Sequence, residues 1–448
     1  MTPKRLHTAI AAHRFGLGEA SLATVGPDPA AWLLDQIGPA EPQRGTDLPS
    51  GIEGLKLFAQ RQAGEPLRAA VVADVRARLS TAATSQQPFN ERLALFWANH
   101  FTVSLAKGST RGIVGAYERE AIRPHIAGSF EALLVAAVKH AGMLRYLDND
   151  RSAGPESAVV RRQARRLRDP GEPGPRITGL NENLAREVLE LHTLGVNGGY
   201  TQADVTAFAR VLTGWRVPLW QVVNGQSGQV TVGFDPAWHE PGAKTVLGKT
   251  YAAGPQALDE VLRDLAGHPA TARHLATKLA RHFVADDPPA ALVAQLQASC
   301  ISSNGDLAAV YRSLVGSPLA WAPTPAKLKT PEEFIVSSAR LLGVGAQAFA
   351  RSPDGGAGPL GQRIQAAPSP AGWPDRAEEW LGPDAVWKRV EWATRVADRL
   401  GRQTDARALA EASLGPLLQE DTRRQIERAA DGPQALALLL LSPEFQRR

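Results

Sequence analysis

The sequence contains little cysteine and no long apolar segment. Its 448 residues include one cysteine, Cys300, which excludes an intramolecular disulfide and a zinc site built from several thiolates. No stretch of about 18 uninterrupted apolar residues occurs, which argues against a membrane-spanning helix. The first apolar run is broken by His7, His13 and Arg14, so it does not have the form of a signal peptide. The sequence as given therefore predicts a cytoplasmic protein, whereas removal of an export signal would leave a periplasmic or exported one.

The common catalytic and nucleotide-binding motifs are also missing. There is no P-loop, no GxGxxG after a strand, no GxSxG, no HExxH and no zinc-finger spacing. The formal net charge of +5 is modest for this length, and few aromatic residues lie among the basic ones. These features argue against nucleic-acid binding, while the positive charge permits anionic ligands.

Helical periodicity is the main pattern in the chain. Apolar residues recur at spacings of three and four in 28–37, 66–82, 89–105, 110–126, 129–141, 179–194, 201–212, 254–267, 269–283, 305–316, 330–343, 383–400 and 432–444. Two β-rich runs, 229–234 and 244–251, suit one small hairpin. The sequence predicts a mainly α protein with a large multi-helix, bundle-like body, one small β-hairpin and long loops.

Three segments rich in glycine, proline or arginine, 38–52, 150–178 and 351–375, have the composition of loops. No shift in composition marks a sharp boundary between domains. We predict a main α-helical domain over 1–345 and a loop with a smaller helical part over 346–448, packed on the first.

The stretch FWANHF (96–101) places a histidine among bulky apolar side chains. At about 100° per residue, His100 falls between Phe96 and Trp97 on the apolar face of the helix. A single histidine on such a face is more often a hydrogen-bonded core residue than a ligand. The alternative is a partly desolvated imidazole that acts as a general base or a metal ligand.

A second stretch, NENLAREVLELHT (181–193), carries several polar residues on one helical face. Arg186, Glu187 and Glu190 all fall within about 60° of Asn183 around the helix axis, and His192 points the other way. They form either a solvated face with a helical ion pair or a buried strip that lines a pocket. Glu190 and His192 diverge by about 160°, so the two side chains are not expected to bind one metal ion together.

Several motifs together resemble one bacterial family. They are HRFGLGE, FWANHF, REAIRPHI, MLRYLDND, LNENLAREVLELHTLGVNGGYTQADVTAFARVLTGW, FDPAWHEPGAKTVLG, ATKLARHFVADDPP, LKTPEEFIVSSARLLG and GWPD. In this order they look like the family called domain of unknown function 1800, from about residue 9 to the end of the chain. The resemblance implies no particular reaction. Members of the family are often exported and encoded beside a family similar to alkaline phosphatases, which implies a partner of that kind.

Two functional hypotheses follow. The first is an enzyme that performs metal-assisted or acid/base chemistry, as a hydrolase or oxidoreductase, on an anionic substrate. Its predicted catalytic residues are Glu187, Glu190, His100, Arg186 and Asn183. A divalent metal ion, if used, would be bound by His100, Glu190 and Glu187, and no other cofactor is indicated. The alternative is a non-catalytic binding or accessory protein in which the polar strip is a structural network.

Overall fold

The computed structural model describes residues 3–60, 64–166, 179–226, 228 and 231–448, and these are mainly helical. The α-helices are α1 (Pro3–Ile10), α2 (Pro29–Leu34), α3 (Gly51–Ala59), α4 (Gly64–Thr84), α5 (Pro88–His100), α6 (Val114–Tyr117), α7 (Phe130–Lys139), α8 (Ala141–Tyr146), α9 (Ala158–Arg166), α10 (Asn183–Glu187), α11 (Gln202–Leu212), α12 (Leu219–Val223), α13 (Gln256–Ala266), α14 (Pro269–Phe283), α15 (Ala290–Ser302), α16 (Leu307–Gly316), α17 (Pro331–Leu341), α18 (Pro383–Leu400), α19 (Ala406–Ser413), α20 (Glu420–Glu427), α21 (Gly432–Leu441) and α22 (Pro443–Gln446). The predicted mainly α fold is confirmed.

Three π-helical turns interrupt or extend these helices: η1 (Ala11–Phe15), η4 (Glu118–Ile122) and η7 (Val188–His192). The last continues α10, so the helix predicted over 179–194 runs from Asn183 to His192 and changes its pitch halfway. Such π-turns occur frequently at functional sites. Short 3₁₀ turns include η5 (Arg123–His125) and η9 (Gly345–Phe349).

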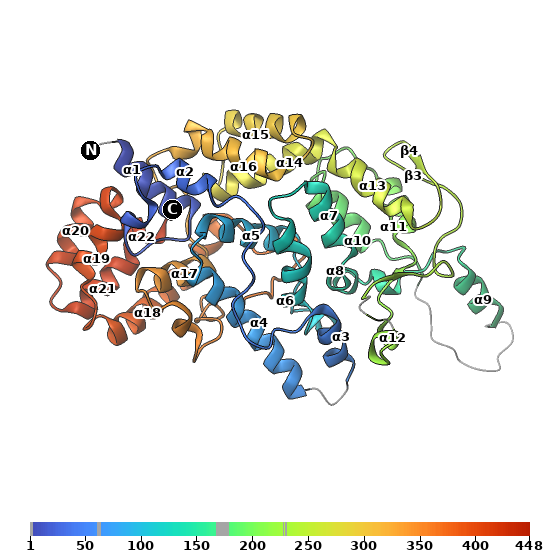
Figure 1. The fold of residues 1–448 in the computed structure, drawn as a ribbon, viewed down its shortest axis with the longest axis horizontal. Helices are drawn as coiled ribbons and strands as arrows, with labels where there is room; N and C mark the ends of the chain where they lie inside the picture. Colours follow the sequence, from blue (N-terminus) through green and yellow to red (C-terminus); the bar gives the residue numbers. More distant parts are fainter. Residues whose placement is uncertain (1–2, 61–63, 167–178, 227, 229–230) are drawn as a thin grey trace.

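The molecule is elongated (Figure 1), with α18–α22 and α1 toward one end and α9, α12 and the β3–β4 hairpin toward the other. Helices α13–α16 run along one long edge, and α4 and α5 lie in the middle. No helix in the described part of the chain is both long enough and apolar enough to cross a membrane.

Helix starts follow local sequence signals. The Asp28 side chain accepts a hydrogen bond from Ala31 N at 3.0 Å, and Pro29 occupies the first turn of α2. Thr201 and Asp204 form the capping box predicted for α11. Another capping box, between Thr330 and Glu333, begins α17 and fixes where the Glu333 carboxylate lies.

The strands pair differently from the prediction that 229–234 and 244–251 form one hairpin. The second run folds on itself, as β3 (Lys244–Val246) and β4 (Lys249–Tyr251). In the first run, β2 (Gly233–Phe234) pairs with β1 (Trp215–Arg216), which carries no strand signal of its own. The 150–178 segment, predicted as a loop, contains α9, and its residues 167–178 lie outside the described part.

Two hydrophobic clusters hold the helices together. The larger draws its buried side chains from residues 10–320, including most of α5, α7, α13 and α14. The smaller joins Leu17 and the α4 residues Val75 and Leu79 to α17 and the helices up to Phe445. Because α4 and α17 belong to the second cluster, the two parts of the chain pack through shared helices. The predicted division at residue 345 stays a prediction.

Candidate functional site

The predicted polar strip of α10 and η7 lies at the surface. Asn183 is exposed, and Arg186 is partly exposed. Arg186 donates a hydrogen bond from Nη2 to Gln202 Oε1 at 2.8 Å and pairs with Glu182 at 3.5 Å. The Arg186 side chain is 41% exposed, so this ion pair contributes under about 1 kcal/mol.

The two carboxylates of the strip are partly buried. Tyr200 donates its hydroxyl proton to Glu190 Oε2 at 3.0 Å. Burial, followed by the nearby charge of Glu190, raises the pKa of Glu187. The environment of Glu187 therefore favours its protonated form.

His100 lies on the other side of this helix, away from the carboxylates. Its Nε2 is 3.1 Å from the carbonyl oxygen of His192, and His274 Nε2 is 3.0 Å from that of Leu191. Carbonyl oxygens only accept hydrogen bonds, so both imidazoles donate from Nε2. The last carbonyl groups of a helix have no partner within the helix, and the two imidazoles donate hydrogen bonds to such carbonyl groups at the end of η7.

Burial, followed by the positive charge of Lys278, lowers the pKa of His100 well below 6.5. The same two causes lower the pKa of His192 to about 3, and both of its ring nitrogens lack a hydrogen-bond partner among the described residues. These imidazoles are therefore neutral at physiological pH. His100 is a weak base held by a backbone carbonyl, which suits a positioning role better than proton transfer.

The three predicted metal ligands are His100, Glu187 and Glu190. Among the described residues, no contact joins His100 to either glutamate. Across the described ranges, no group of three or more His, Cys, Asp or Glu side chains is arranged to hold a metal ion. The metal site therefore stays a prediction.

His100 does line a pocket of about 290 Å³, between α5, α14, the start of α17 and the loop after η9. Its lining residues are Leu17, Arg78, Arg92, Leu95, Phe96, Asn99, His100, Lys278, Arg281, His282, Thr330, Glu332, Glu333, Gln362, Ala371, Trp373, Pro374, Asp375, Arg376 and Glu379. Asn183, Arg186, Glu187 and Glu190 are not among them. The pocket lies where residues of the two hydrophobic clusters meet, and its wall is unusually rich in charge.

One face of α14 supplies three cationic or titratable groups to this wall. Lys278, Arg281 and His282 are spaced by three and four residues, which places them on the same side of the helix. Arg281 donates from Nε to the carbonyl oxygen of Asp286 at 3.1 Å. Lys278 is partly buried and makes no hydrogen bond or ion pair with any residue that the structure describes.

Burial lowers the pKa of Lys278 to about 8, and Asp375 opposes this effect only in part. An ammonium with this pKa is charged at pH 7 and loses its proton easily just above it. Such a group binds anions and also donates or accepts protons near physiological pH.

His282 and Asp375 form a hydrogen-bonded pair in the same pocket. His282 Nδ1 lies 3.1 Å from Asp375 Oδ2, and His282 Nε2 has no partner in the described part of the chain. Burial alone would raise the pKa of Asp375, but its interaction with His282 and the positive charges of Lys327 and Arg448 bring it to about 2. Asp375 is therefore ionised and accepts a hydrogen bond from His282 Nδ1. Burial lowers the pKa of His282, and Asp375 opposes this effect, so the imidazole is neutral with Nε2 unprotonated.

Asn99 fixes the loop that carries Asp375. Its side-chain amide donates to the carbonyl oxygen of Trp373 at 2.9 Å and accepts from Trp373 N at 2.8 Å. Gly372 has a φ of +83°, and a Cβ there would lie 2.5 Å from the Asn99 carbonyl oxygen. Only glycine allows this close approach, so Asn99 and Gly372 position Asp375 from α5.

Buried ion pairs form the opposite wall. Arg78 donates from Nε to Glu332 Oε1 at 2.6 Å and from Nη1 to Glu118 Oε1 at 2.7 Å. Because each of these charged side chains already has a partner, none of them is free to bind a ligand in the pocket.

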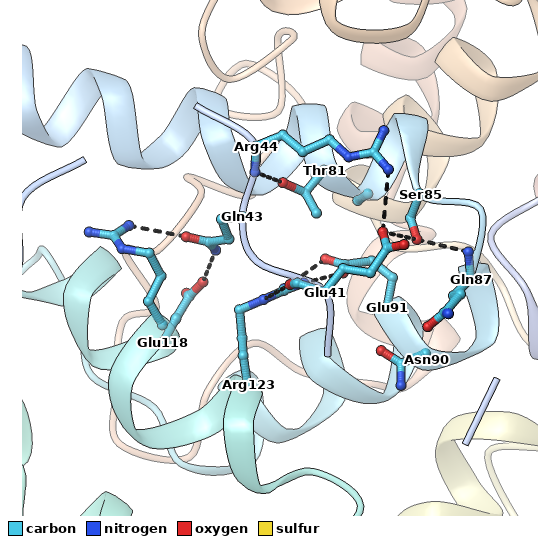
Figure 2. Close-up of polar contacts among 12 residues, drawn as sticks. Glu41, Gln43, Arg44, Thr81, Ser85, Gln87, Asn90, Glu91, Glu118 and Arg123 are labelled. Carbon is cyan, nitrogen blue, oxygen red and sulfur yellow. Dashed lines mark hydrogen bonds and ion pairs between the residues drawn. The ribbon is translucent and has the colours of Figure 1, made fainter. Parts of the chain in front are cut away.

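Figure 2 shows further polar contacts of Glu118 and of the residues near it. Gln43 donates to Glu118 at 3.2 Å, and Arg123 of η5 donates to Glu91 at 3.0 and 2.6 Å. Arg123 also contacts the carbonyl oxygen of Glu41. These groups join α4, α5 and η4, and their contacts are those of a structural network.

Sequence reasoning found His100 and missed Lys278, His282 and Asp375 as site residues. The spacing K-x-x-R-H in 278–282 indicates one helical face, but it is common on solvated helices. The GWPD motif containing Asp375 lies 93 residues after His282 along the chain. Nothing in the sequence alone brings these two motifs together.

Comparison with known proteins identifies the family. A search of curated proteins finds no match, and neither does a search of solved structures. Residues 10–447 match the family described as "Protein of unknown function (DUF1800)". The match covers nearly the whole chain, including both sides of the pocket. The chain therefore belongs to the DUF1800 family.

Proposed function

We propose that this protein is an enzyme that binds a small anionic substrate in the pocket between α5 and α14 and performs acid/base chemistry there. The observation that carries the proposal is the unpartnered Lys278 one helical turn before the His282–Asp375 pair. A free cation beside an oriented imidazole supports both substrate binding and proton transfer.

Each residue would have a distinct role. Lys278 would bind the substrate anion, since the other lining cations hold carboxylates or backbone oxygens. His282 would accept a proton at Nε2, and the charge of Asp375 would stabilise the imidazolium that forms. His100 would position the end of η7 against the pocket.

The earlier assignment of catalysis to Asn183, Arg186, Glu187 and Glu190 remains a prediction. These residues lie on a different face from the pocket, and Glu187 is the one whose raised pKa supports an acid/base role. A divalent metal at Glu187, Glu190 and His100 has no support from the contacts of these side chains. The residues of the pocket support anion binding and proton transfer, two steps that hydrolases and oxidoreductases share.

The alternative is a binding or accessory protein in which the same pocket holds an anion without reaction. An alkaline-phosphatase-like partner and an exported or cytoplasmic location are likewise predictions from the sequence. Nothing in the geometry of the pocket requires a partner chain.

The binding step is tested by removing the charge of Lys278. We expect at least one anion from a panel of phosphate, sulfate, 2-oxo acids and 2-hydroxy acids to raise the melting temperature of the wild-type protein. A ligand at 100 times its Kd stabilises by about 2.7 kcal/mol. Lys278→Met should lose this shift, because the substitution keeps the length of the side chain and removes the ammonium. Lys4→Met changes an exposed lysine of α1 and serves as the control.

A panel that leaves the wild-type melting temperature unchanged, or that shifts Lys278→Met equally, would contradict the binding proposal. Catalysis is separated from binding by NMR in D₂O with the 2-oxo or 2-hydroxy acid that binds. Deuterium exchange into the bound acid that is lost in Asp375→Asn would support an enzyme. Binding without exchange or any product would favour the accessory role.

A further inference from the structure

A second cavity, of about 720 Å³, lies between α17, α18 and η9. It shares no lining residue with the pocket around Lys278. Its volume is within the range of about 300–1,000 Å³ that is typical of ligand sites. No part of the proposed function uses it.

The floor of this groove is apolar. Ala339 and Phe349 are buried there, and Trp392, Val396 and Leu400 present partly exposed side chains from α18. Trp392 donates from Nε1 to the carbonyl oxygen of Gly355 at 2.9 Å, which holds the indole ring in place. The groove therefore offers an apolar surface of fixed shape that no other described segment covers.

The rim is cationic. Arg395 and Arg399 are four residues apart on α18, so they lie on one face of the helix, and Arg351 lies on the far side of the groove. All three are exposed, and none makes an ion pair or hydrogen bond that involves its guanidinium within the described chain. Asp398, the nearest acidic residue in sequence, forms no ion pair with either arginine of α18 among the described residues.

We infer that this groove binds an anionic amphiphile, with an acyl chain on the apolar floor and its carboxylate or phosphate between the arginines. The apolar floor suits an acyl chain, and the arginines of the rim suit an anionic group on the same ligand. A purely apolar ligand would leave the arginines without a partner, and a small anion would leave Trp392 and Val396 in water. The guanidinium group is the side chain best suited to carboxylate and phosphate oxygens.

The inference is tested by titrating the full chain with cis-parinaric acid and with its uncharged methyl ester, following probe fluorescence. We expect saturable, one-site binding of the acid. The double substitution Arg395→Ser with Arg399→Ser should weaken it by about five- to tenfold, as two exposed ion pairs allow. The ester should bind the wild type more weakly by a similar factor, and the double substitution should not weaken it further. Arg312→Ser with Arg428→Ser removes the same charge elsewhere and should change nothing.

Val396→Trp places a larger side chain in the groove and should abolish binding of both probes. Unchanged melting temperatures would show that these surface variants remain folded. Equal affinities for acid and ester in the wild type would overturn the inference, as would an effect of the control pair as large as that of the groove pair. Binding of an amphipathic peptide but not of parinarate would assign the groove to a protein partner and would also overturn it.

Discussion

Glu333→Ala should destabilise the protein by about 3–5 kcal/mol, the cost of leaving a buried charge without its partner. Glu333 is buried at the start of α17 and contacts Arg92 and Arg448 Nη2, the latter at 2.8 Å. It also accepts from Thr330 N at 2.9 Å in the capping box. Lys329, buried nearby, has no hydrogen-bond partner for Nζ among the described residues. Removing this carboxylate therefore leaves the buried guanidinium groups of Arg92 and Arg448 without their counter-charge.

The effect is measured as the free energy of unfolding in urea. Glu333→Gln retains the shape of the side chain and can still form the capping box, so this substitution removes only the charge. It should cause most of the destabilisation that we expect for Glu333→Ala. Glu65→Ala removes an ion pair with Arg68 in which the side chains are 77% and 72% exposed, and it should cost under about 1 kcal/mol. Equal losses for Glu333→Ala and Glu65→Ala would show that the buried network does not stabilise the fold.

Stability should fall by several kcal/mol between pH 7 and pH 5. Burial lowers the pKa of His13 to about 4 and that of His192 to about 3. An imidazole in the unfolded chain has a pKa of about 6.5, so below this pH the unfolded state binds more protons and gains stability. Each of these two histidines then costs about 2 kcal/mol by pH 5. His100, whose pKa is also lowered, adds to the loss.

His274, whose pKa burial lowers to about 4, adds about 2 kcal/mol to the loss, whereas a buried carboxyl group opposes it. Burial raises the pKa of Asp74 to about 6, so Asp74 opposes the loss by about 1 kcal/mol in the same window. The pKa of Asp375, about 2, keeps that carboxylate ionised throughout. Urea unfolding at both pH values measures the net change. His192→Leu should reduce the difference by about 2 kcal/mol, whereas His7→Leu, which changes an exposed side chain, should not. A stability that is equal at pH 5 and pH 7 would contradict this assignment of buried neutral histidines.

The helices were predictable because apolar spacing and caps are local signals. The patterns in 66–82 and 383–400 correspond to α4 and α18, and the capping box at Thr201 begins α11. The pairing of β2 with β1 was not predictable, because two-residue strands have no periodicity and their pairing depends on the surrounding helices. The π-turn η7 has no clear sequence signal either, although it sets the direction of the polar strip.

The site was predictable only in part, for a similar reason. His100 was found because one buried polar residue in an apolar stripe is conspicuous within a single helix. The pairing of His282 with Asp375 depends on the two hydrogen bonds between the Asn99 side chain and the Trp373 backbone, which hold the loop at 372–375 against α5 and α14. The lowered pKa of Lys278 depends on burial by segments from several parts of the chain. The His282–Asp375 pair and the lowered pKa of Lys278 arise from the tertiary structure, so no residue spacing in the sequence indicates them.

The pKa of Lys278 tests the proposed anion site most directly. The rate at which this amine reacts with acetic anhydride, followed by peptide mass spectrometry from pH 6 to pH 11, gives its titration curve. We predict an apparent pKa near 8 and a slower reaction in the presence of an anion that binds the pocket. A Lys278 that titrates near 10.4, as an ordinary lysine does, or that is equally reactive with and without such an anion, would contradict it.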